Sequence, residues 1–197
     1  MVSLTENESR AMGLLIRDFS KSYNINQLAK AINISPGGMF KLLKKLKSRD
    51  YLTEEKLGNN IFYKINYNSS ESLDTCTFIL SEKKLTPYLK VWLRDLASLK
   101  NKTDVAIIFG SAMEKAQKAG DIDILLVFNS KDLQEIESLV DSINKIKPKK
   151  LHAIYQTKQD LITNIKKQDK VILEIIKKGI ILWGGNSLVK AIKDGQD

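Results

Sequence analysis

The chain has 197 residues, 43% of them hydrophobic and 28% charged, which is typical of one or two folded domains and excludes a disordered, collagen-like or disulfide-rich protein. It has one cysteine and one histidine, and no apolar run reaches the length of about 18 residues that spans a membrane, so we expect a cytoplasmic protein without membrane contact or an intrachain disulfide. The formal net charge of +9 favours polyanionic partners such as nucleic acid or nucleotide phosphates, although a generally lysine-rich proteome would explain it equally well.

The first third of the chain carries the signals of three helices. Apolar residues at helical spacing predict a helix over 6–20, and Asn24 with Gln27 forms a reciprocal N-terminal cap for a short second helix. Ser35 as N-cap and Pro36 as first helical residue predict a third, basic helix. The residues that this third helix would bury are Met39, Leu42, Leu43 and Leu46.

Two strand-like runs follow this basic helix and flank Gly58-Asn59-Asn60, a turn that tolerates positive φ, so they predict a hairpin. This order of elements is that of a winged helix-turn-helix, and residues 8–66 resemble that family. We expect the basic helix to enter the major groove of double-stranded DNA, where bare glycine backbone and cationic side chains meet bases and phosphates. The candidate DNA-binding residues are Gly37, Gly38, Lys41, Lys44, Lys45 and Arg49. Alternatively, the winged helix mediates only protein contacts.

A polar segment separates this region from the rest of the chain. We expect one domain over 1–70, a linker over 71–85 in which CTFIL forms a stray strand, and a second domain over 86–197. The second domain begins with a strongly amphipathic helix after Thr86. That helix either packs on the following domain or forms the seam of a homodimer.

From residue 104 onward, strands alternate with helices. VAIIF, DIDILLVF, LHAIY and GIILW are expected as strands, and residues 131–147 and 158–178 as helices. The predicted fold class is therefore α/β (α+β), with an N-terminal winged helix and a C-terminal domain built on a mixed sheet flanked by helices.

Two features of this second domain predict a common site. Gly110 and Ser111 lie where a strand gives way to a helix, and they offer N–H groups and a hydroxyl to phosphates. Asp121 and Asp123 begin the next strand and share one face because they are two residues apart. Two carboxylates about 7 Å apart can hold Mg²⁺ or Mn²⁺ against a triphosphate, so the pattern predicts a site for a metal-bound NTP.

At these residues the chain resembles the DNA polymerase β-like nucleotidyltransferase superfamily in its minimal single-domain form, over roughly residues 88–184. The resemblance is carried by FGS at 109–111 and DIDILLVF at 121–128. It implies that Gly110 and Ser111 contact the phosphates of the nucleotide and that Asp121 and Asp123 bind the catalytic metals. An archaeal type of fused winged helix and minimal nucleotidyltransferase has the same order of domains.

The chain departs from that family in its third catalytic carboxylate. The strand that should supply it, residues 150–155, has no acid, and His152 occupies roughly that place. His152 is either a substituted base or a polar strand residue with a structural role, while Asp160 and Glu174 are expected on helices. Two functions follow: an enzyme that transfers a nucleoside monophosphate from NTP to a protein or nucleic-acid hydroxyl, or a transcriptional regulator whose degraded domain senses nucleotide or dimerises.

Overall fold

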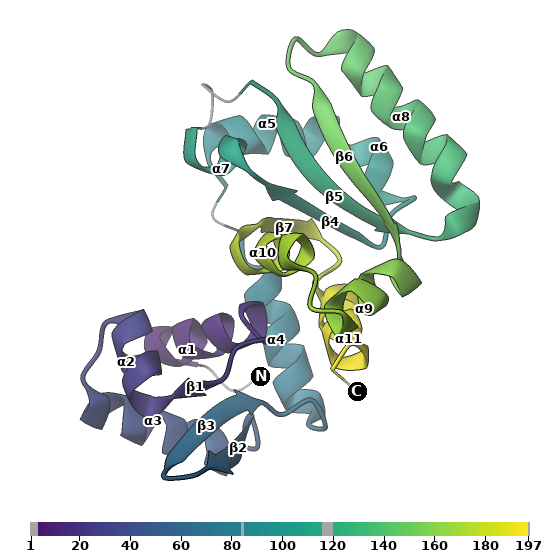
Figure 1. Cartoon of the computed structure of the whole chain (residues 1–197). Coiled ribbons are helices and arrows are strands. Elements are labelled where there is room, and N and C mark those ends of the chain that lie inside the picture. Colours follow the sequence, from purple (N-terminus) through teal and green to yellow (C-terminus); the bar gives the residue numbers. More distant parts are fainter. Residues whose placement is uncertain (1–3, 84, 116–119, 197) are drawn as a thin grey trace. The chain divides into compact units, whose positions relative to one another are not determined.

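The computed structural model describes residues 4–83, 85–115 and 120–196 (Figure 1). The chain divides into two compact units, residues 1–80 and 81–197, each with its own sheet. Within the described residues, no helix combines the length and the apolar character that crossing a bilayer requires.

The first unit contains three helices and a hairpin in the predicted order, followed by one more helix (Figure 1). Its elements are α1 (Glu6–Arg17), β1 (Tyr23–Asn24), α2 (Ile25–Ile32), α3 (Pro36–Ser48), β2 (Leu52–Leu57), β3 (Asn60–Ile65) and α4 (Ser70–Ser81). The three strands form an antiparallel sheet in the order β1-β3-β2. This arrangement is a winged helix-turn-helix, with α3 in the place of the recognition helix.

The local signals that begin these elements are those in the sequence. Asn24 and Gln27 cap α2 reciprocally, each side chain accepting a hydrogen bond of 2.9 Å from the other's backbone N–H. Ser35 accepts from the backbone N–H of Gly38 at 3.1 Å to cap α3. Gly58 has a φ of 60° in the hairpin turn, which is the left-handed conformation that glycine adopts without strain. The predicted caps and turn are confirmed.

The segment CTFIL is helical, so the prediction of a stray strand is wrong, and residues 71–81 of the predicted linker over 71–85 belong to a helix. α4 places four residues on one buried helical stripe. These residues are Ser72, Cys76, Ile79 and Leu80. The hydroxyl of Ser72 donates a hydrogen bond of 3.0 Å to the carbonyl oxygen of Tyr51, at the start of the hairpin. α4 is therefore part of the first domain, because its buried face packs there.

The second unit holds a four-stranded mixed sheet in the order β6-β5-β4-β7, in which β5 and β6 are parallel and the other neighbours antiparallel. Its elements are α5 (Pro87–Asp95), α6 (Ala97–Lys100), β4 (Val105–Phe109), α7 (Ser111–Lys115), β5 (Ile122–Phe128), a 3₁₀ turn (Ser130–Asp132), α8 (Leu133–Ile146), β6 (Leu151–Thr157), α9 (Lys158–Lys166), α10 (Lys170–Lys178), β7 (Ile180–Trp183) and α11 (Gly185–Asp194). The part of the helix predicted after Gly110 that falls on residues 116–119 lies outside the described residues.

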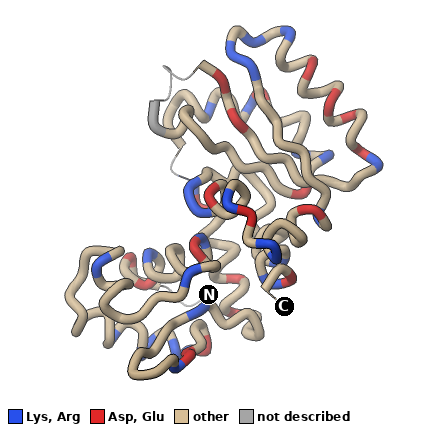
Figure 2. The backbone as a smooth tube through the Cα atoms, in the orientation of Figure 1, with Lys and Arg blue, Asp and Glu red and all other residues tan. Residues whose placement is uncertain are grey.

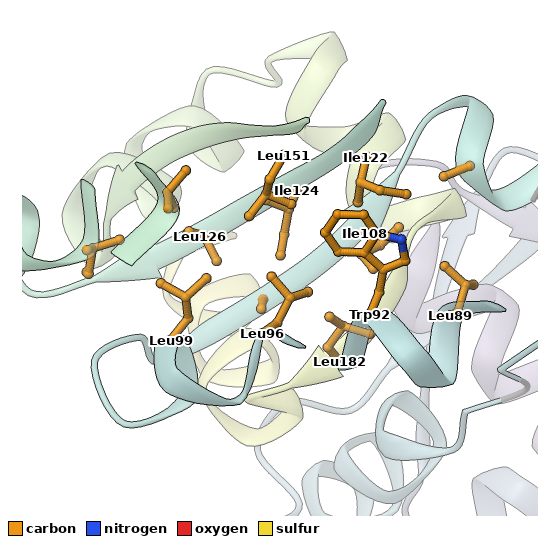
Figure 3. Packing of buried hydrophobic residues seen from close by; sticks show 14 of the residues in the cluster. Leu89, Trp92, Leu96, Leu99, Ile108, Ile122, Ile124, Leu126, Leu151 and Leu182 are labelled. Carbon is orange, nitrogen blue, oxygen red and sulfur yellow. The ribbon is translucent and has the colours of Figure 1, made fainter. Parts of the chain in front are cut away.

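One face of this sheet packs against α5, α6 and α8 (Figure 3). Trp92 of α5 and Leu96 and Leu99 beside it are buried against strand residues such as Ile124 and Leu126. The amphipathic helix after Thr86 therefore packs on its own domain, the first of its two predicted roles. It is divided into α5 and α6 at Leu96.

The opposite face of the sheet meets α9, α10 and α11, which contact β4 and β5. Because side chains alternate along a strand, Ile107 and Leu125 point to this face, and both are fully buried. Asp123 lies two residues before Leu125, so its carboxylate lies on this same face, near the N-terminal end of β5. The fold thus places Asp123 at the start of β5, on the face of the sheet that α9, α10 and α11 cover.

Candidate functional site

The carboxylate of Asp123 lies beside the imidazole of His152. In the sheet, Asp123 of β5 is paired with Phe109 of β4 on one side and with His152 of β6 on the other. The Nδ1 of His152 lies 3.9 Å from the Oδ1 of Asp123. The histidine side chain is 60% exposed and the aspartate side chain 33% exposed, so solvent and a ligand can reach both. Parallel, in-register pairing therefore brings together two residues that are distant in the sequence.

Gly110 leaves space for the Asp123 carboxylate. Its φ of 74° lies in the left-handed region, and a Cβ added to it would come within 2.3 Å of the Oδ2 of Asp123. Any other residue here would meet both a strained backbone and a direct clash. Ser111 follows as the first residue of α7 and is exposed. The turn at Gly110 thus lies against the Asp123 carboxylate, while the phosphate contact and the metal ligand stay predictions.

Asp121 occupies a different position from Asp123. It is half-buried and lies directly before β5, whose first residue, Ile122, donates a backbone hydrogen bond of 2.9 Å to the carbonyl oxygen of Lys150. Among the described residues, no three His, Cys, Asp or Glu side chains lie close enough to hold a metal together. The structure therefore brings Gly110, Asp123 and His152 together, but it does not complete a three-ligand site with Asp121.

A pocket of about 380 Å³ borders the Gly-Ser turn. Phe109 and Gly110 form one wall, and α10 forms the other. The α10 residues that line it are Lys170, Val171, Glu174, Ile175 and Lys178. Glu174 and Lys178 form an ion pair, with 2.7 Å between Oε2 and Nζ. A lining that has both apolar and cationic side chains suits a ligand with a flat apolar part and negative charge.

The position of α10 beside the Gly-Ser turn was not predicted from the sequence. A signal was present, since Lys170, Glu174 and Lys178 recur every four residues and so fall on one face of a helix. Which face meets the sheet depends on tertiary packing, and the pairing of α10 with β4 could not be derived from that spacing alone.

On the first domain, the predicted DNA-binding residues divide into two groups. Gly37, Lys41 and Lys44 of α3 are exposed, and a Cβ on Gly37 would find no atom within 4 Å. Gly38 is also exposed, but a Cβ there would lie 3.2 Å from the Oγ of Ser35, the cap of the helix. Lys and Arg residues occur throughout both domains (Figure 2). A count of basic residues therefore does not identify a DNA-binding surface, and the candidate surface is defined by the position of Lys41 and Lys44 on α3.

Lys45 and Arg49 are held by the buried carboxylate of Glu8. The Nζ of Lys45 lies 2.8 Å from the Oε1 of Glu8, and the Nη1 of Arg49 lies 4.0 Å from the same atom. Arg49 is only 18% exposed, and its guanidinium lies over the ring of Tyr51, 4.7 Å from the centroid. Arg49 therefore packs within the first domain in this structure, and its role as a DNA contact stays a prediction.

The neighbours of Glu8 lower the pKa of its carboxyl group. Burial alone would raise the pKa of Glu8, but hydrogen bonds from Lys45 and from Thr5 outweigh it and hold the pKa below its ordinary value. A carboxylate that is charged and enclosed requires its cation, so Lys45 joins α3 to α1.

Among the comparisons with known proteins, the match to a family model falls in the second domain. Residues 93–187 match the family model for "Polymerase beta, Nucleotidyltransferase". This nucleotidyltransferase domain contains Gly110, Asp123 and His152, and the match covers all four strands of its sheet. A comparison with curated proteins found no match.

Among solved structures, the chain is similar to ZitR of Lactococcus lactis, described as a zinc-responsive MarR family member. That structure is 19% identical, covers 51% of this chain and 76% of its own, and gives a TM-score of 0.31. A structure of ZitR with one cysteine replaced by serine is 17% identical, with the same coverage and a TM-score of 0.32. At these scores the assignment of the winged helix rests on its own elements and their order.

Proposed function

We propose that the chain binds double-stranded DNA through its winged helix and a metal-bound NTP through its nucleotidyltransferase domain, and that it transfers a nucleoside monophosphate to a hydroxyl of protein or nucleic acid. The order of its domains is that of the archaeal fusion which the sequence resembles. The observation that carries the proposal is the enclosure of the Asp123 carboxylate by the bare turn at Gly110, with His152 at 3.9 Å. Only a glycine fits at position 110 beside that carboxylate, and a bare backbone turn is expected where a phosphate chain and a cation must approach together.

The DNA-binding half of the proposal rests on α3. Its exposed Lys41 and Lys44 can neutralise phosphates, and Gly37 leaves the start of the helix open to close approach. The hairpin of β2 and β3 follows α3 directly, as a wing does in this fold. Binding to a nucleic acid also suits the net charge of +9.

The nucleotide would occupy the turn and the pocket that borders it. A volume of about 380 Å³ lies within the range of small-ligand pockets, and Phe109 and Val171 offer apolar surface for a base. Lys170 and Lys178 lie at the same pocket and can neutralise phosphate charge. Oxygen donors from Asp121 and Asp123 suit Mg²⁺ or Mn²⁺, which would supply charge neutralisation along the triphosphate.

The transfer itself forms one bond and breaks another. The oxygen of the acceptor hydroxyl bonds to the α-phosphorus, and the bond from that phosphorus to the bridging oxygen of pyrophosphate breaks. The proton of the acceptor goes to water, or to a nitrogen of His152 where that imidazole binds no cation, and pyrophosphate leaves as an anion beside Lys170 and Lys178. Positioning and charge stabilisation supply most of the catalysis in such transfers, so a missing third carboxylate reduces the rate without excluding the reaction.

Labelled nucleotide tests this proposal. The chain is incubated with NTP labelled at the α-phosphate, Mg²⁺ or Mn²⁺ and DNA, and label is measured on protein and on nucleic acid. We expect label with wild type, none with Asp123→Asn, and wild-type label with Lys190→Ala, an exposed change on α11. If label were absent from wild type under conditions in which NTP binds, transfer would be refuted.

A second function is favoured by one observation, namely that the described residues contain no three-ligand metal cluster. In that function the nucleotidyltransferase domain binds NTP without turnover and adjusts DNA binding by the winged helix, as a regulator would. It predicts that NTP changes the affinity for DNA while label appears on neither protein nor nucleic acid.

A further inference from the structure

We infer that His152 is a direct ligand of the cation bound with the nucleotide, and that it makes the site select a nitrogen-accepting metal such as Mn²⁺ over Mg²⁺. This inference rests on the proposed binding of metal-bound NTP. It goes further because it gives the only histidine of the chain a role as a metal ligand that sets which cation binds.

The backbone fixes the two donors side by side. Asp123 and His152 are directly paired in the parallel strands β5 and β6, so both side chains leave the sheet on the same face. Their facing atoms, Oδ1 and Nδ1, are 3.9 Å apart. Two ligands that each lie about 2.1 Å from one metal are roughly 3–4 Å apart, so a cation fits between them with small side-chain rotations.

The imidazole of His152 is accessible to a cation. β6 is an edge strand of its sheet, and the His152 side chain is 60% exposed. Within the part of the chain that the structure describes, Asp123 is the acidic residue that lies within 4.0 Å of this imidazole. Because the imidazole and the neighbouring carboxylate are both partly exposed to solvent, a hydrated cation can reach the two side chains.

The donor chemistry then decides the metal. Mg²⁺ strongly prefers oxygen ligands and gives up water reluctantly, whereas first-row transition metals accept imidazole nitrogen. Mn²⁺ is the transition metal that, like Mg²⁺, suits carboxylate and phosphate oxygens, so a site with one imidazole and several oxygens favours Mn²⁺ over Mg²⁺. Because the described residues offer no third convergent ligand, the remaining positions fall to nucleotide phosphates and water. Metal and NTP should therefore bind together, and each weakly alone.

A selectivity measurement tests the inference without relying on activity. The affinity of each metal is determined from the thermal shift of the NTP complex, in chain prepared without a histidine tag. In wild type we expect Mn²⁺ to bind more tightly than Mg²⁺, and we expect the ratio of the two affinities to fall about tenfold or more in His152→Asp, which restores an all-oxygen site. His152→Ala should weaken Mn²⁺ by a similar factor with less effect on Mg²⁺, and Gln159→Ala, an exposed neutral change on α9, should leave the ratio unchanged.

Pulsed EPR of the Mn²⁺–NTP complex shows the ligand directly. Because the chain has one histidine, incorporation of ¹⁵N-histidine labels only this imidazole. We expect a nitrogen coupling that changes with the isotope in wild type and is absent from His152→Ala. If Mn²⁺ and NTP bind but no histidine coupling is seen, or if the metal ratio is the same in His152→Asp, the inference is wrong and the proposed nucleotide site stands. If neither metal binds with NTP, the proposed nucleotide site is refuted as well.

Discussion

Lys45 and Glu8 connect α3 to α1, with 2.8 Å between Nζ and Oε1. The glutamate side chain is only 3% exposed, whereas the lysine side chain is 54% exposed. One end of this pair is therefore buried and the other lies on the helix that would face DNA. If α3 binds DNA as proposed, we expect Lys41 and Lys44 to make its phosphate contacts, because Lys45 is engaged with Glu8.

The first prediction concerns stability. Lys45→Ala should lower the free energy of unfolding by about 1–3 kcal/mol, because it leaves the buried Glu8 carboxylate without its hydrogen-bonding cation. Lys41→Ala, an exposed change on the same helix, should stay within about 0.5 kcal/mol of wild type. Urea unfolding of both variants measures the difference. Equal stability of the two would show that the pair contributes nothing.

The second prediction concerns pH. The pKa of Glu8 is lowered in the folded chain from an ordinary value of 4.5. A carboxyl group whose folded pKa lies below its unfolded pKa stabilises the fold above the unfolded value, and that contribution is lost as the pH falls through the folded value. In Glu8→Gln, the free energy of unfolding should therefore fall less steeply below pH 4.5 than in wild type. Glu6→Gln, an exposed change in the same turn, should keep the wild-type slope.

The third prediction concerns phosphate contacts. Replacing both Lys41 and Lys44 with alanine should remove two phosphate contacts and reduce the slope of log K for DNA against log salt by about 2. Fluorescence titrations at several salt concentrations give the slope. The matched control, Lys166→Ala with Lys190→Ala, removes the same charge from the other domain and should leave the slope unchanged. A wild-type slope in the α3 variant would remove α3 from the DNA interface.

The fourth prediction concerns Gly37, where one substitution should change the free energy of unfolding and the affinity for DNA in opposite directions. Gly37→Ala adds a methyl group into open space within a helix and should raise the free energy of unfolding by about 0.5–1 kcal/mol. The same methyl group should weaken DNA binding if backbone approaches DNA at this end of α3. A variant that is more stable and binds DNA as wild type would place the start of α3 away from the duplex.

The fifth prediction concerns the turn beside Asp123. Gly110→Ala should destabilise the domain by about 1–2 kcal/mol through its positive φ and should displace the carboxylate, so the thermal shift produced by Mn²⁺ with NTP should be lost. Gly120→Ala, where a Cβ meets no atom within 4 Å, is the matched control and should retain that shift. If Gly110→Ala kept a full shift, the close approach at Asp123 would not matter for ligand binding.

The sequence predicted best the features that depend on neighbouring residues. The caps at Asn24 and Ser35 and the turn at Gly58 are local, so their residue types were sufficient. CTFIL was misassigned because a short apolar run fits either period, and because the buried stripe of α4 includes Ser72, a polar residue whose partner lies 21 positions earlier. The last helix, α11, was not predicted, although Leu188 and Ile192 are fully buried at a spacing of four.

The candidate site was predictable in part for the same reason. Gly110 directly follows β4, whose last residue, Phe109, is paired with Asp123, and alternation along β5 fixed the face of the carboxylate. The register that pairs Asp123 with His152 is a property of the parallel sheet, and sequence alone placed the histidine only approximately. The contact of Glu8 with Lys45 and Arg49 spans about 40 residues of chain and could not be read from any local pattern.

Cys76 has a practical consequence for experiments on this chain. It is the only cysteine, it is fully buried in α4, and burial raises the pKa of its thiol to about 12. At neutral pH the thiolate that reacts with maleimides is therefore almost absent. A cysteine introduced at Asn59, in the exposed hairpin turn, would be the one reactive thiol of the folded chain, and a fluorophore attached there could follow DNA engagement without removal of the native residue.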